Sequence, residues 1–479
     1  MTPPPKIQFP ETIHKIHLIA ICGTAMAALA CLLQELGYAI SGSDQHVYPP
    51  MSDFLRAKGI PIFEGYHAEH LNHQPDLVVV GNAVSKTNPE VQAMEALGLP
   101  YCSMPQAINQ FAAKGKQQIV VTGTHGKTTT SSFIAWMLHC AGLDPSFLIG
   151  GIVSNFNSNY RAGKGSWIVL EGDEYDTAFF DKGPKFWHYS PSVAVLTSVE
   201  FDHADIFNDL EQIISVFGEM LARLSSQAAL VAFDGDATIA GILPRSRGQY
   251  VGYGHDKQSP WRLGDVRIEP PKTLFDVYFQ DHLFARFSTH MIGMHNLLNM
   301  LAGIAVGHHL KLSIDVIARA LETFKGARRR QEIRGVKNDI VVIDDFAHHP
   351  TAVRATIDAV KQFYGRRRLI AVFEPRTNTS RRNIFQAVYP QAFSNADLIC
   401  IRQAPMLEKI PVDERFSSEK LVAELTSRRK EALYFPDTDG IIAYLSLNAR
   451  PGDVVLIMSN GGFDNIHQRL LDSLGPRDN

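Results

Sequence analysis

The feature that most constrains this chain is a glycine-rich turn between an apolar strand and an amphipathic helix. The turn reads GTHGKT at 123–128, directly after the apolar segment 119–122 and ahead of a helical pattern at 128–140. Backbone N–H groups of such a turn converge with the positive end of the helix dipole, so they bind phosphate. We therefore expect an α/β sheet with a nucleotide phosphate site at the end of one strand.

The same turn supplies two side chains that phosphate chemistry uses. Lys127 is placed to reach the β- and γ-phosphates of ATP, and the Thr128 hydroxyl is placed to bind Mg²⁺. Val121 stands where the strict phosphate-loop pattern has glycine, so only the shortened form GxxGKT is present. A chance Gly-Lys-Thr turn is the alternative. The predicted ATP-binding residues of the turn are Gly123, Thr124, His125, Gly126, Lys127, Thr128 and Thr129.

Two acidic segments are candidates for the carboxylate that a phosphate-bound Mg²⁺ ion usually needs. EGDEYD at 171–176 and EFDH at 200–203 each follow an apolar strand. Ligands bind at the carboxyl ends of strands in open α/β sheets, which favours both segments. Solvated loops or helix N-caps are the alternative interpretation of such clusters.

Alternating strand and helix patterns predict three α/β domains in series. At 479 residues, the chain exceeds what one hydrophobic core usually organises. Residues 1–112 are predicted as a Rossmann-like domain, and the polar stretch AAKGKQQ at 112–118 is predicted as the linker that follows it. Residues 113–325 are predicted as a central P-loop ATPase-like parallel sheet, and residues 326–479 as a second Rossmann-like domain.

The first strand–turn–helix unit carries a second candidate binding site. Its turn reads CGTAMA at 22–27, and Asp44 follows the next strand. Only one of the three glycines of a dinucleotide fingerprint is present, and Ala25 or Ala27 would crowd a pyrophosphate, so a full NAD site is not expected. The open alternatives are a nucleotide or sugar nucleotide at this crevice, or a Rossmann-like domain without ligand.

Composition argues against several other classes of protein. The formal net charge of −3 gives no basic field for a nucleic-acid backbone. The five cysteines form no CxxC pair, which argues against a disulfide framework or a structural zinc site. No apolar run approaches the roughly 20 residues of a membrane span, and the N-terminus has no signal-peptide pattern. We therefore expect a cytoplasmic protein without nucleic-acid or membrane partners.

Six ordered motifs carry a resemblance that covers essentially the whole chain. They are GTHGKTTT at 123–130, EGDEYD at 171–176, EFDHAD at 200–205, GMHNLLNMLAG at 293–303, FKGARRRQE at 324–332 and DDFAHHP at 344–350. In this order they resemble the motifs of the Mur ligase family, which joins amino acids or peptides to UDP-N-acetylmuramate. The resemblance implies an ATP- and Mg²⁺-dependent amide ligase that activates a carboxylate as an acyl phosphate.

Further stretches narrow the amine substrate that the resemblance implies. They are ICGTAM at 21–26, SDQHVYPPMS at 43–52, EYDTAFFDK at 174–182, FEPRTNTSRRN at 373–383 and MSNGGFDNIHQRLL at 458–471. These stretches resemble family members that attach the tripeptide L-Ala-γ-D-Glu-meso-diaminopimelate in peptidoglycan recycling. The implied partners are UDP-N-acetylmuramate and this tripeptide, bound by a monomer or weak homo-oligomer. The alternatives are a member that takes L-alanine in cell-wall synthesis and, more distantly, a non-catalytic nucleotide-binding regulator.

The resemblance also assigns roles to individual residues. The implied catalytic residues are Lys127, Glu171, His203, Arg330 and His348. The implied metal ligands are Thr128, Glu171 and His203. Further ATP contacts are implied for Asn296 and Asn299 near the adenine, Arg330 at the γ-phosphate and Asp345 at the ribose.

The remaining implied roles concern the two other substrates. The UDP-sugar would be held by Gly23, Thr24, Ala25, Met26, Ser43 and Asp44. The amine substrate would contact His348 and Arg376, with His348 or His349 as the base that deprotonates the amine. The alternative for the two histidines is a purely structural role. Asn296 could instead cap its helix, and Arg330 could lie in a solvated basic turn.

Overall fold

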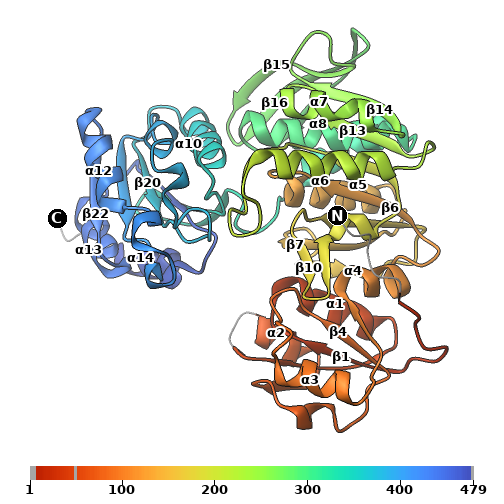
Figure 1. Cartoon of the computed structure of the whole chain (residues 1–479). Coiled ribbons are helices and arrows are strands. Elements are labelled where there is room, and N and C mark those ends of the chain that lie inside the picture. Colours follow the sequence, from red (N-terminus) through yellow and green to blue (C-terminus); the bar gives the residue numbers. More distant parts are fainter. Residues whose placement is uncertain (1–6, 48–50, 476–479) are drawn as a thin grey trace.

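The structure is a computed structural model of the chain, and it describes residues 7–47 and 51–475. Part of the predicted 43–52 stretch, residues 48–50, therefore lies outside the described residues. Three large sheets follow one another along the chain, each with helices packed around it (Figure 1). The predicted α/β class with three domains is confirmed, while the boundaries at 112 and 325 stay predictions.

The first domain is built on a five-stranded parallel sheet in the order β3-β2-β1-β4-β5. Its strands are β1 (Lys15–Ile19), β2 (Ala39–Asp44), β3 (Ile62–Glu64), β4 (Leu77–Val80) and β5 (Tyr101–Ser103). Its helices are α1 (Thr24–Glu35), α2 (Met51–Ala57), α3 (Pro89–Ala96) and α4 (Met104–Ala107). The strand order reverses beside β1, so the crevice after β1 is the switch point where ligands of such sheets bind.

The central domain has a ten-stranded sheet in the order β17-β16-β15-β14-β13-β12-β6-β9-β7-β8. The strands nearest its centre are β6 (Gln117–Thr122), β7 (Ser146–Val153), β9 (Trp167–Gly172), β12 (Pro191–Leu196), β13 (Ala229–Phe233) and β14 (Gln249–Gly254). Its helices are α5 (Lys127–Cys140), α6 (Leu210–Arg223), α7 (Ala237–Ile242), α8 (Met294–His309) and α9 (Ile314–Thr323). Because β6 lies between β9 and β12 and runs parallel to both, the phosphate loop and both acidic segments emerge at one edge.

Both ends of the central sheet depart from the predicted all-parallel arrangement. At one end β8 (Ser158–Arg161) pairs antiparallel with β7. At the other, β15 (Trp261–Glu269), β16 (Lys272–Phe279) and β17 (His282–Thr289) form an antiparallel meander. Short turns join these three strands, which leaves no room for the helix that a parallel crossover needs. A separate two-stranded ribbon pairs β10 (Asp176–Ala178) with β11 (Asp181–Pro184).

The third domain has a six-stranded sheet in the order β18-β19-β23-β20-β21-β22. Its strands are β18 (Glu332–Lys337), β19 (Ile340–Asp345), β20 (Leu369–Phe373), β21 (Leu398–Arg402), β22 (Glu431–Phe435) and β23 (Val454–Met458), of which only β18 runs antiparallel to its neighbour. Its helices are α10 (Pro350–Tyr364), α11 (Tyr389–Ala392), α12 (Ser418–Ser427), α13 (Thr438–Asn448) and α14 (Ile466–Ser473). Two apolar cores, one on each face, bury this sheet.

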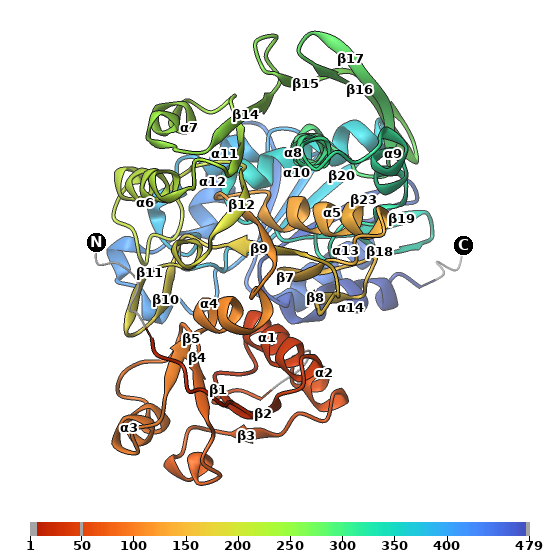
Figure 2. The same ribbon diagram turned by 90° about the vertical axis from the view of Figure 1, so that its right-hand side faces the viewer.

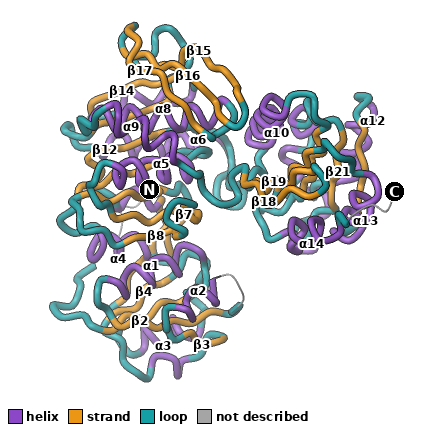
Figure 3. Tube along the Cα trace, turned by 180° about the vertical axis from the view of Figure 1, so that it is seen from behind, coloured by secondary structure: helices purple, strands orange, loops and turns teal. Residues whose placement is uncertain are grey.

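The domains contact one another at defined points. Helix α1 packs against β7 and β8, where the Tyr160 hydroxyl donates to Glu35 at 2.9 Å (Figure 2). The third domain lies to one side of the central domain when the molecule is seen from behind (Figure 3). Asn378 bonds Asp205 at 2.8 Å across this boundary. None of the helices in the described parts of the chain has the length and apolar character needed to cross a membrane.

Candidate active site

A cavity of about 700 Å³ lies where the three domains meet, and it gathers most of the predicted site residues. Those that line it are Gly23, Thr24, Ala25, Met26, Thr124, His125, Gly126, Lys127, Thr128, Thr129, Glu171, His203, Asn296, Asn299, Arg330, Asp345 and His348. Residues predicted to act on three different substrates therefore border one continuous space. Their individual roles toward a ligand stay predictions.

The phosphate loop has a backbone that only glycine permits at two positions. Gly123 has φ 129°, and a Cβ there would lie 2.8 Å from the Ser198 backbone nitrogen. Gly126 has φ 82°, and its Cβ would lie 2.5 Å from the Asn299 side-chain oxygen. The left-handed turn at Gly126 starts α5 at Lys127 and leaves the helix N-terminus directed at the cavity. This is the geometry expected for binding a phosphate.

Lys127 is held in place by a buried carboxylate that the sequence did not single out. Its ammonium group donates to Glu174 at 2.8 Å and to the Gly123 carbonyl at 2.6 Å. Glu174 is almost fully buried, with a side chain that is 1% exposed. Burial disfavours both charges, but the pair outweighs it, so the pKa of Lys127 is raised and that of Glu174 is lowered. The only signal in the sequence was that Glu174 belongs to the EGDEYD cluster.

The donor groups around Lys127 fit a divalent cation. The second carboxylate oxygen of Glu174 is buried and pairs with Nε2 of His203 at 3.2 Å. Glu171 accepts a hydrogen bond from the Gly150 N–H at 3.0 Å and interacts with the Thr128 hydroxyl. Carboxylate and hydroxyl oxygens of this kind are ligands that Mg²⁺ prefers, and they suit a phosphate-bound ion. Thr128 thus lies beside Glu171, and His203 lies beside Glu174, which the sequence did not single out.

His203 occupies a strained backbone position beside this group. Its φ is 55°, in the left-handed region, and its N–H donates to the Asp202 carboxylate at 2.7 Å. Burial works against charge on the imidazole, but the bond and charge of Glu174 outweigh it and raise the pKa of His203. Strain of this kind persists where surrounding contacts fix the residue, and it is concentrated at functional sites.

Arg330, which is half-buried, and Asp345, which is buried, both line the cavity on the side nearest the third domain. Arg330 lies 4.7 Å from the centre of the Phe346 ring, and burial lowers the pKa of its guanidinium. The Asp345 carboxylate accepts the N–H of Gln331 at 2.8 Å and that of Ala347 at 2.7 Å. Asp345 therefore fixes both the segment that carries Arg330 and the loop that leads to α10.

Asn296 and Asn299 project from the first turn of α8, where both are buried. The Asn296 amide donates to the Ile292 carbonyl and to Gln331, each at 2.9 Å. Asn299 donates to the Asn296 oxygen at 3.4 Å. Gly293, rather than Asn296, is the N-cap of this helix, which argues against the capping alternative. Asn296 instead ties α8 to the segment that carries Arg330.

The two histidines of the third domain have different surroundings. His348 borders the cavity, and its Nε2 lies 3.6 Å from the Asp202 carboxylate. His349 is buried and caps α10 by accepting the Thr351 N–H. Burial, together with the charge of His125, lowers the pKa of His349 to about 4. His348 therefore faces the cavity, while His349 belongs to the domain boundary.

Four of the predicted substrate contacts lie outside the cavity wall, and Gly123 of the phosphate loop is one of them. Arg376 sits 3.5 Å from the buried Glu374 carboxylate. The Ser43 hydroxyl donates to the buried Glu90. Asp44 accepts the Cys22 N–H at 2.9 Å and so holds the turn that leads into α1. Asp44 thus shapes the predicted UDP-sugar site through the backbone of that turn.

Comparison with known proteins places the whole chain in one family. Residues 15–116 match the Mur ligase family catalytic domain, residues 121–307 the Mur ligase middle domain, and residues 329–461 the Mur ligase glutamate ligase domain. The UDP-N-acetylmuramate–L-alanyl-γ-D-glutamyl-meso-2,6-diaminoheptandioate ligase of Escherichia coli (strain K12) is 38% identical, over 97% of this chain and 99% of the relative. The UDP-N-acetylmuramate–L-alanine ligase of Desulforamulus reducens is 33% identical, over 96% and 98%.

Solved structures agree with this placement. A murein peptide ligase from Psychrobacter arcticus superposes with a TM-score of 0.71 at 35% identity, covering 97% of this chain and 99% of the other. A UDP-N-acetylmuramate–alanine ligase from Thermotoga maritima gives 0.80 at 25% identity, covering 96% and 99%. The motifs, the three sheets and the shared cavity all agree with these matches, and the chain belongs to the Mur ligase family.

Proposed function

We propose that this protein is an ATP-dependent ligase that joins L-Ala-γ-D-Glu-meso-diaminopimelate to UDP-N-acetylmuramate, giving ADP and phosphate in peptidoglycan recycling. The observation that carries the proposal is the Lys127–Glu174–His203 cluster at the phosphate loop, of which Lys127 and His203 line a cavity that all three domains border. Two relatives whose names state this reaction are 38% and 37% identical over nearly the full chain. The same substrates and ATP make the cytoplasm the expected compartment.

The first chemical step needs positive charge around the transferred phosphoryl group. The lactyl carboxylate of UDP-N-acetylmuramate attacks the γ-phosphorus, the bond to the ADP oxygen breaks, and an acyl phosphate forms. Lys127 and Arg330 flank the cavity and neutralise negative charge that builds during the transfer. Mg²⁺, when bound by Thr128, Glu171, Glu174 and His203, supplies further charge neutralisation at the phosphates.

The second step needs a neutral amine. The free amine of the tripeptide alanine attacks the acyl carbon, and the tetrahedral intermediate expels phosphate. His348 is our candidate for the base, because its Nδ1 lies 3.1 Å from the Phe346 carbonyl and its Nε2 faces the cavity beside Asp202. Donation from Nδ1 to that carbonyl leaves Nε2 free to accept the proton in neutral histidine. His349 is a weaker candidate because hydrogen bonds already engage both of its ring nitrogens.

One segment bears on the choice of amine substrate. Thr377 and Ser380 bond each other at 2.8 Å next to Arg376, so two small hydroxyl side chains stand at this point. Small side chains leave room for a peptide rather than for a single amino acid. Arg376 remains our candidate to bind a peptide carboxylate, which requires it to leave Glu374.

The test compares two amines with the same protein. Phosphate release is measured with UDP-N-acetylmuramate, ATP and Mg²⁺, and with either the tripeptide or L-alanine as acceptor. We expect turnover with the tripeptide to exceed that with L-alanine by at least about 100-fold, since the free energy of the extra contacts enters the transition state. Equal or faster turnover with L-alanine would instead favour the alternative function, an L-alanine ligase of cell-wall synthesis. Release without any acceptor measures the background.

The size of the assembly and the division of the chain are also part of the proposal. We propose a monomer or a weak homo-oligomer. The proposed domains are residues 1–112 for the UDP-sugar, 113–325 for ATP and 326–479 for the peptide. Sedimentation at micromolar protein concentration tests the first statement, and a stable dimer would contradict it.

A further inference from the structure

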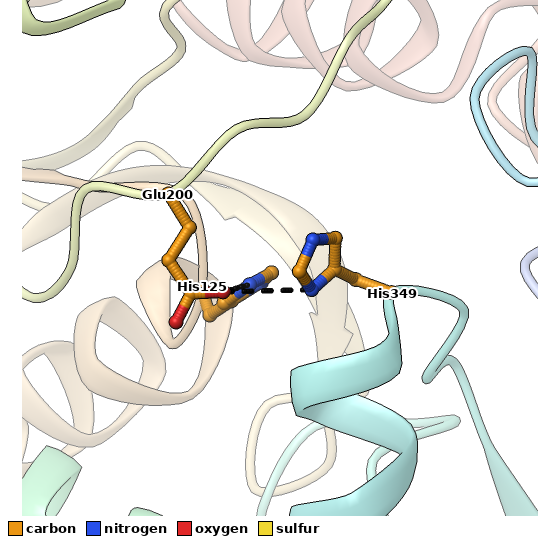
Figure 4. A group of neighbouring side chains, drawn as sticks. All are labelled: His125, Glu200 and His349. Atoms are coloured by element: carbon orange, nitrogen blue, oxygen red, sulfur yellow. Dashed lines mark hydrogen bonds and ion pairs between the residues drawn. The ribbon is translucent and has the colours of Figure 1, made fainter. Parts of the chain in front are cut away.

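Three side chains from distant parts of the sequence meet at the boundary between the central and third domains. His125 belongs to the phosphate loop, Glu200 follows β12, and His349 begins α10. One nitrogen or carboxylate oxygen of each lies within 4.8 Å of the others. Figure 4 shows His349 reaching from the third domain toward the other two side chains. The roles proposed above leave Glu200 and His349 without a function.

The distances within this group match a metal site. Nε2 of His125 lies 3.3 Å from Oε2 of Glu200, and Nδ1 of His349 lies 3.5 Å from the same oxygen. Zinc binds nitrogen and oxygen at about 2.0–2.2 Å in tetrahedral sites, which puts neighbouring ligand atoms roughly 3.3–3.5 Å apart. Two edges of such a tetrahedron are therefore present. The third, between the imidazoles, must shorten from at most 4.8 Å.

The Nδ1 lone pair of His349 accepts one long backbone hydrogen bond, and the same nitrogen faces the Glu200 carboxylate. Nε2 of His349 donates to the Phe201 carbonyl at 3.2 Å, and its Nδ1 accepts the Thr351 N–H at 3.3 Å. Nδ1 therefore carries no proton, and it faces the Glu200 carboxylate at 3.5 Å. Two electron-rich atoms at this distance repel unless positive charge lies between them. A ring nitrogen bonded to a backbone carbonyl is also the usual outer-shell arrangement of a metal-binding histidine.

The other two side chains are also held firmly. The His125 backbone N–H donates to the Ser198 hydroxyl at 2.8 Å. The Thr351 hydroxyl donates to Oε2 of Glu200 at 2.8 Å. That bond competes with a cation for the same oxygen, so a bound ion takes the Glu200 carboxylate with Thr351 turned aside or through the second oxygen. A bound ion also has to take the Nδ1 lone pair of His349 from the Thr351 N–H.

We propose that His125, Glu200 and His349 bind one divalent metal ion of the zinc class, apart from the Mg²⁺ that ATP requires. Two imidazoles and one carboxylate suit zinc, cobalt or nickel, whereas Mg²⁺ prefers oxygen ligands. Three protein ligands leave a fourth position for water or a substrate oxygen. Because His349 comes from the third domain, the ion links that domain to the phosphate loop and stabilises the arrangement in which they touch.

The experiment uses the full-length protein after treatment with a chelator. Zn²⁺ is added by calorimetric titration in excess Mg²⁺, and Co²⁺ is added in parallel because its visible spectrum reports tetrahedral nitrogen and oxygen ligands. We expect one ion per chain. His349→Ala and Glu200→Gln each weaken binding by at least about 100-fold, because a lost ligand costs more than the 10- to 100-fold of a lost outer-shell partner.

Two further variants separate this site from others that bind metal. His203→Ala removes a ligand of the proposed Mg²⁺ site, and His282→Ala removes an exposed histidine at the start of β17. Both are expected to retain the zinc-class ion. Binding that survives Glu200→Gln, or that is lost equally in His203→Ala, overturns the proposal. Glu200→Gln keeps the size of the side chain, so it decides the question even if His349→Ala does not fold.

Discussion

Two strand–turn–helix units in this molecule border the same cavity, and they differ in what surrounds the turn. In the first, β1 leads into α1, whose first turn has no acidic residue and whose last turn has no basic one. In the second, β6 leads into α5, and Lys127 sits there among Glu171, Asp173 and Glu174. Both turns present a helix N-terminus to the cavity. The backbone geometry therefore accounts for anion binding at each turn. Only the turn after β6 also has the buried charges that phosphoryl transfer needs.

The glycines of the two turns also differ in the space around them, and the second turn is again the more constrained. A Cβ on Gly23 would meet only the Ala20 carbonyl at 3.6 Å, an ordinary contact. A Cβ on Gly126 would collide with Asn299, and its φ of 82° disfavours any other residue. The first turn can accept small side chains, whereas the second is closely packed on all sides. A phosphate bound by the second turn is consequently held in one orientation, as group transfer requires.

Removing the lysine should have the largest effect. We expect Lys127→Met to lower kcat by at least about 10³-fold, because a charge that acts on the transferred phosphoryl group is lost. It also leaves Glu174 buried without a cation, at a cost of about 3–5 kcal/mol in the free energy of unfolding. The double variant Lys127→Met/Glu174→Gln removes both charges and should recover most of that stability without recovering activity. Phosphate release and urea unfolding measure the two effects.

An outcome in which the double variant regained activity would show that Lys127 acts only by neutralising Glu174. Lys182→Met is the matched control, since its ion pair with Asp176 is exposed and lies outside the cavity wall. It should change neither measurement appreciably.

The buried carboxylate of Asp173, in the second of these units, should also make the free energy of unfolding depend on pH. Burial opposes ionisation of Asp173, but Lys185 at 2.7 Å and Lys127 outweigh it and lower the pKa of Asp173 to about 2. A carboxylate whose pKa falls on folding stabilises the protein above its unfolded pKa of about 3.9, and that stabilisation is lost as the pH falls toward 2. At pH 7 the contribution is about 2 kcal/mol.

Asp173→Asn should therefore unfold more easily than the parent protein at pH 7, and the difference should shrink below pH 4. Denaturant unfolding at several pH values measures it. The control is Asp176→Asn, whose partner Lys182 is exposed. A difference that stayed constant down to pH 2.5 would mean that Asp173 acts through packing rather than through its charge.

The sequence could predict some parts of the fold and of the candidate site, but not others. The phosphate loop and the roles of Lys127 and Thr128 depend on a local strand, turn and helix, which periodicity and glycine placement reveal. Which carboxylate of EGDEYD meets Lys127 depends on how the chain turns after β9, so Glu174 went unrecognised. The β15–β17 meander was also missed, although turns at Pro270–Pro271 and Gln280–Asp281 mark it. The approach of His348 to Asp202 depends on how two domains dock, which no local pattern encodes.

The two glycines offer a direct comparison of the turns. Gly126→Ala should raise the KM for ATP by roughly 20-fold, since it adds a left-handed strain of about 1–2 kcal/mol and a collision with Asn299. Gly23→Ala should change the KM for UDP-N-acetylmuramate by less than about twofold, because its backbone is extended and the Cβ has room. Initial rates at varied substrate give both values. Equal changes in KM for the two variants would show that the two turns do not differ in how strictly they require glycine.

The smallest effect is expected from the carboxylate that shapes the first turn. Asp44 accepts the N–H groups of Cys22 at 2.9 Å and His46 at 3.0 Å, so it fixes the turn without lining the cavity. Asp44→Ala should raise the KM for UDP-N-acetylmuramate by about fivefold to tenfold, which corresponds to the net loss of roughly one ordinary hydrogen bond. The kcat should hardly change, because no interaction with the transferring phosphoryl group is removed.

Asp53→Ala on α2 is the control for this last variant, since its ion pair with Arg56 is exposed and contributes little to stability. If Asp44→Ala lowered kcat as strongly as Lys127→Met while KM stayed the same, the first turn would take part in the chemistry. The division into a binding turn and a reacting turn would then be wrong. If only KM rises, the first unit contributes binding energy and orientation. The charges buried around β6 and β9 then stabilise the transition state.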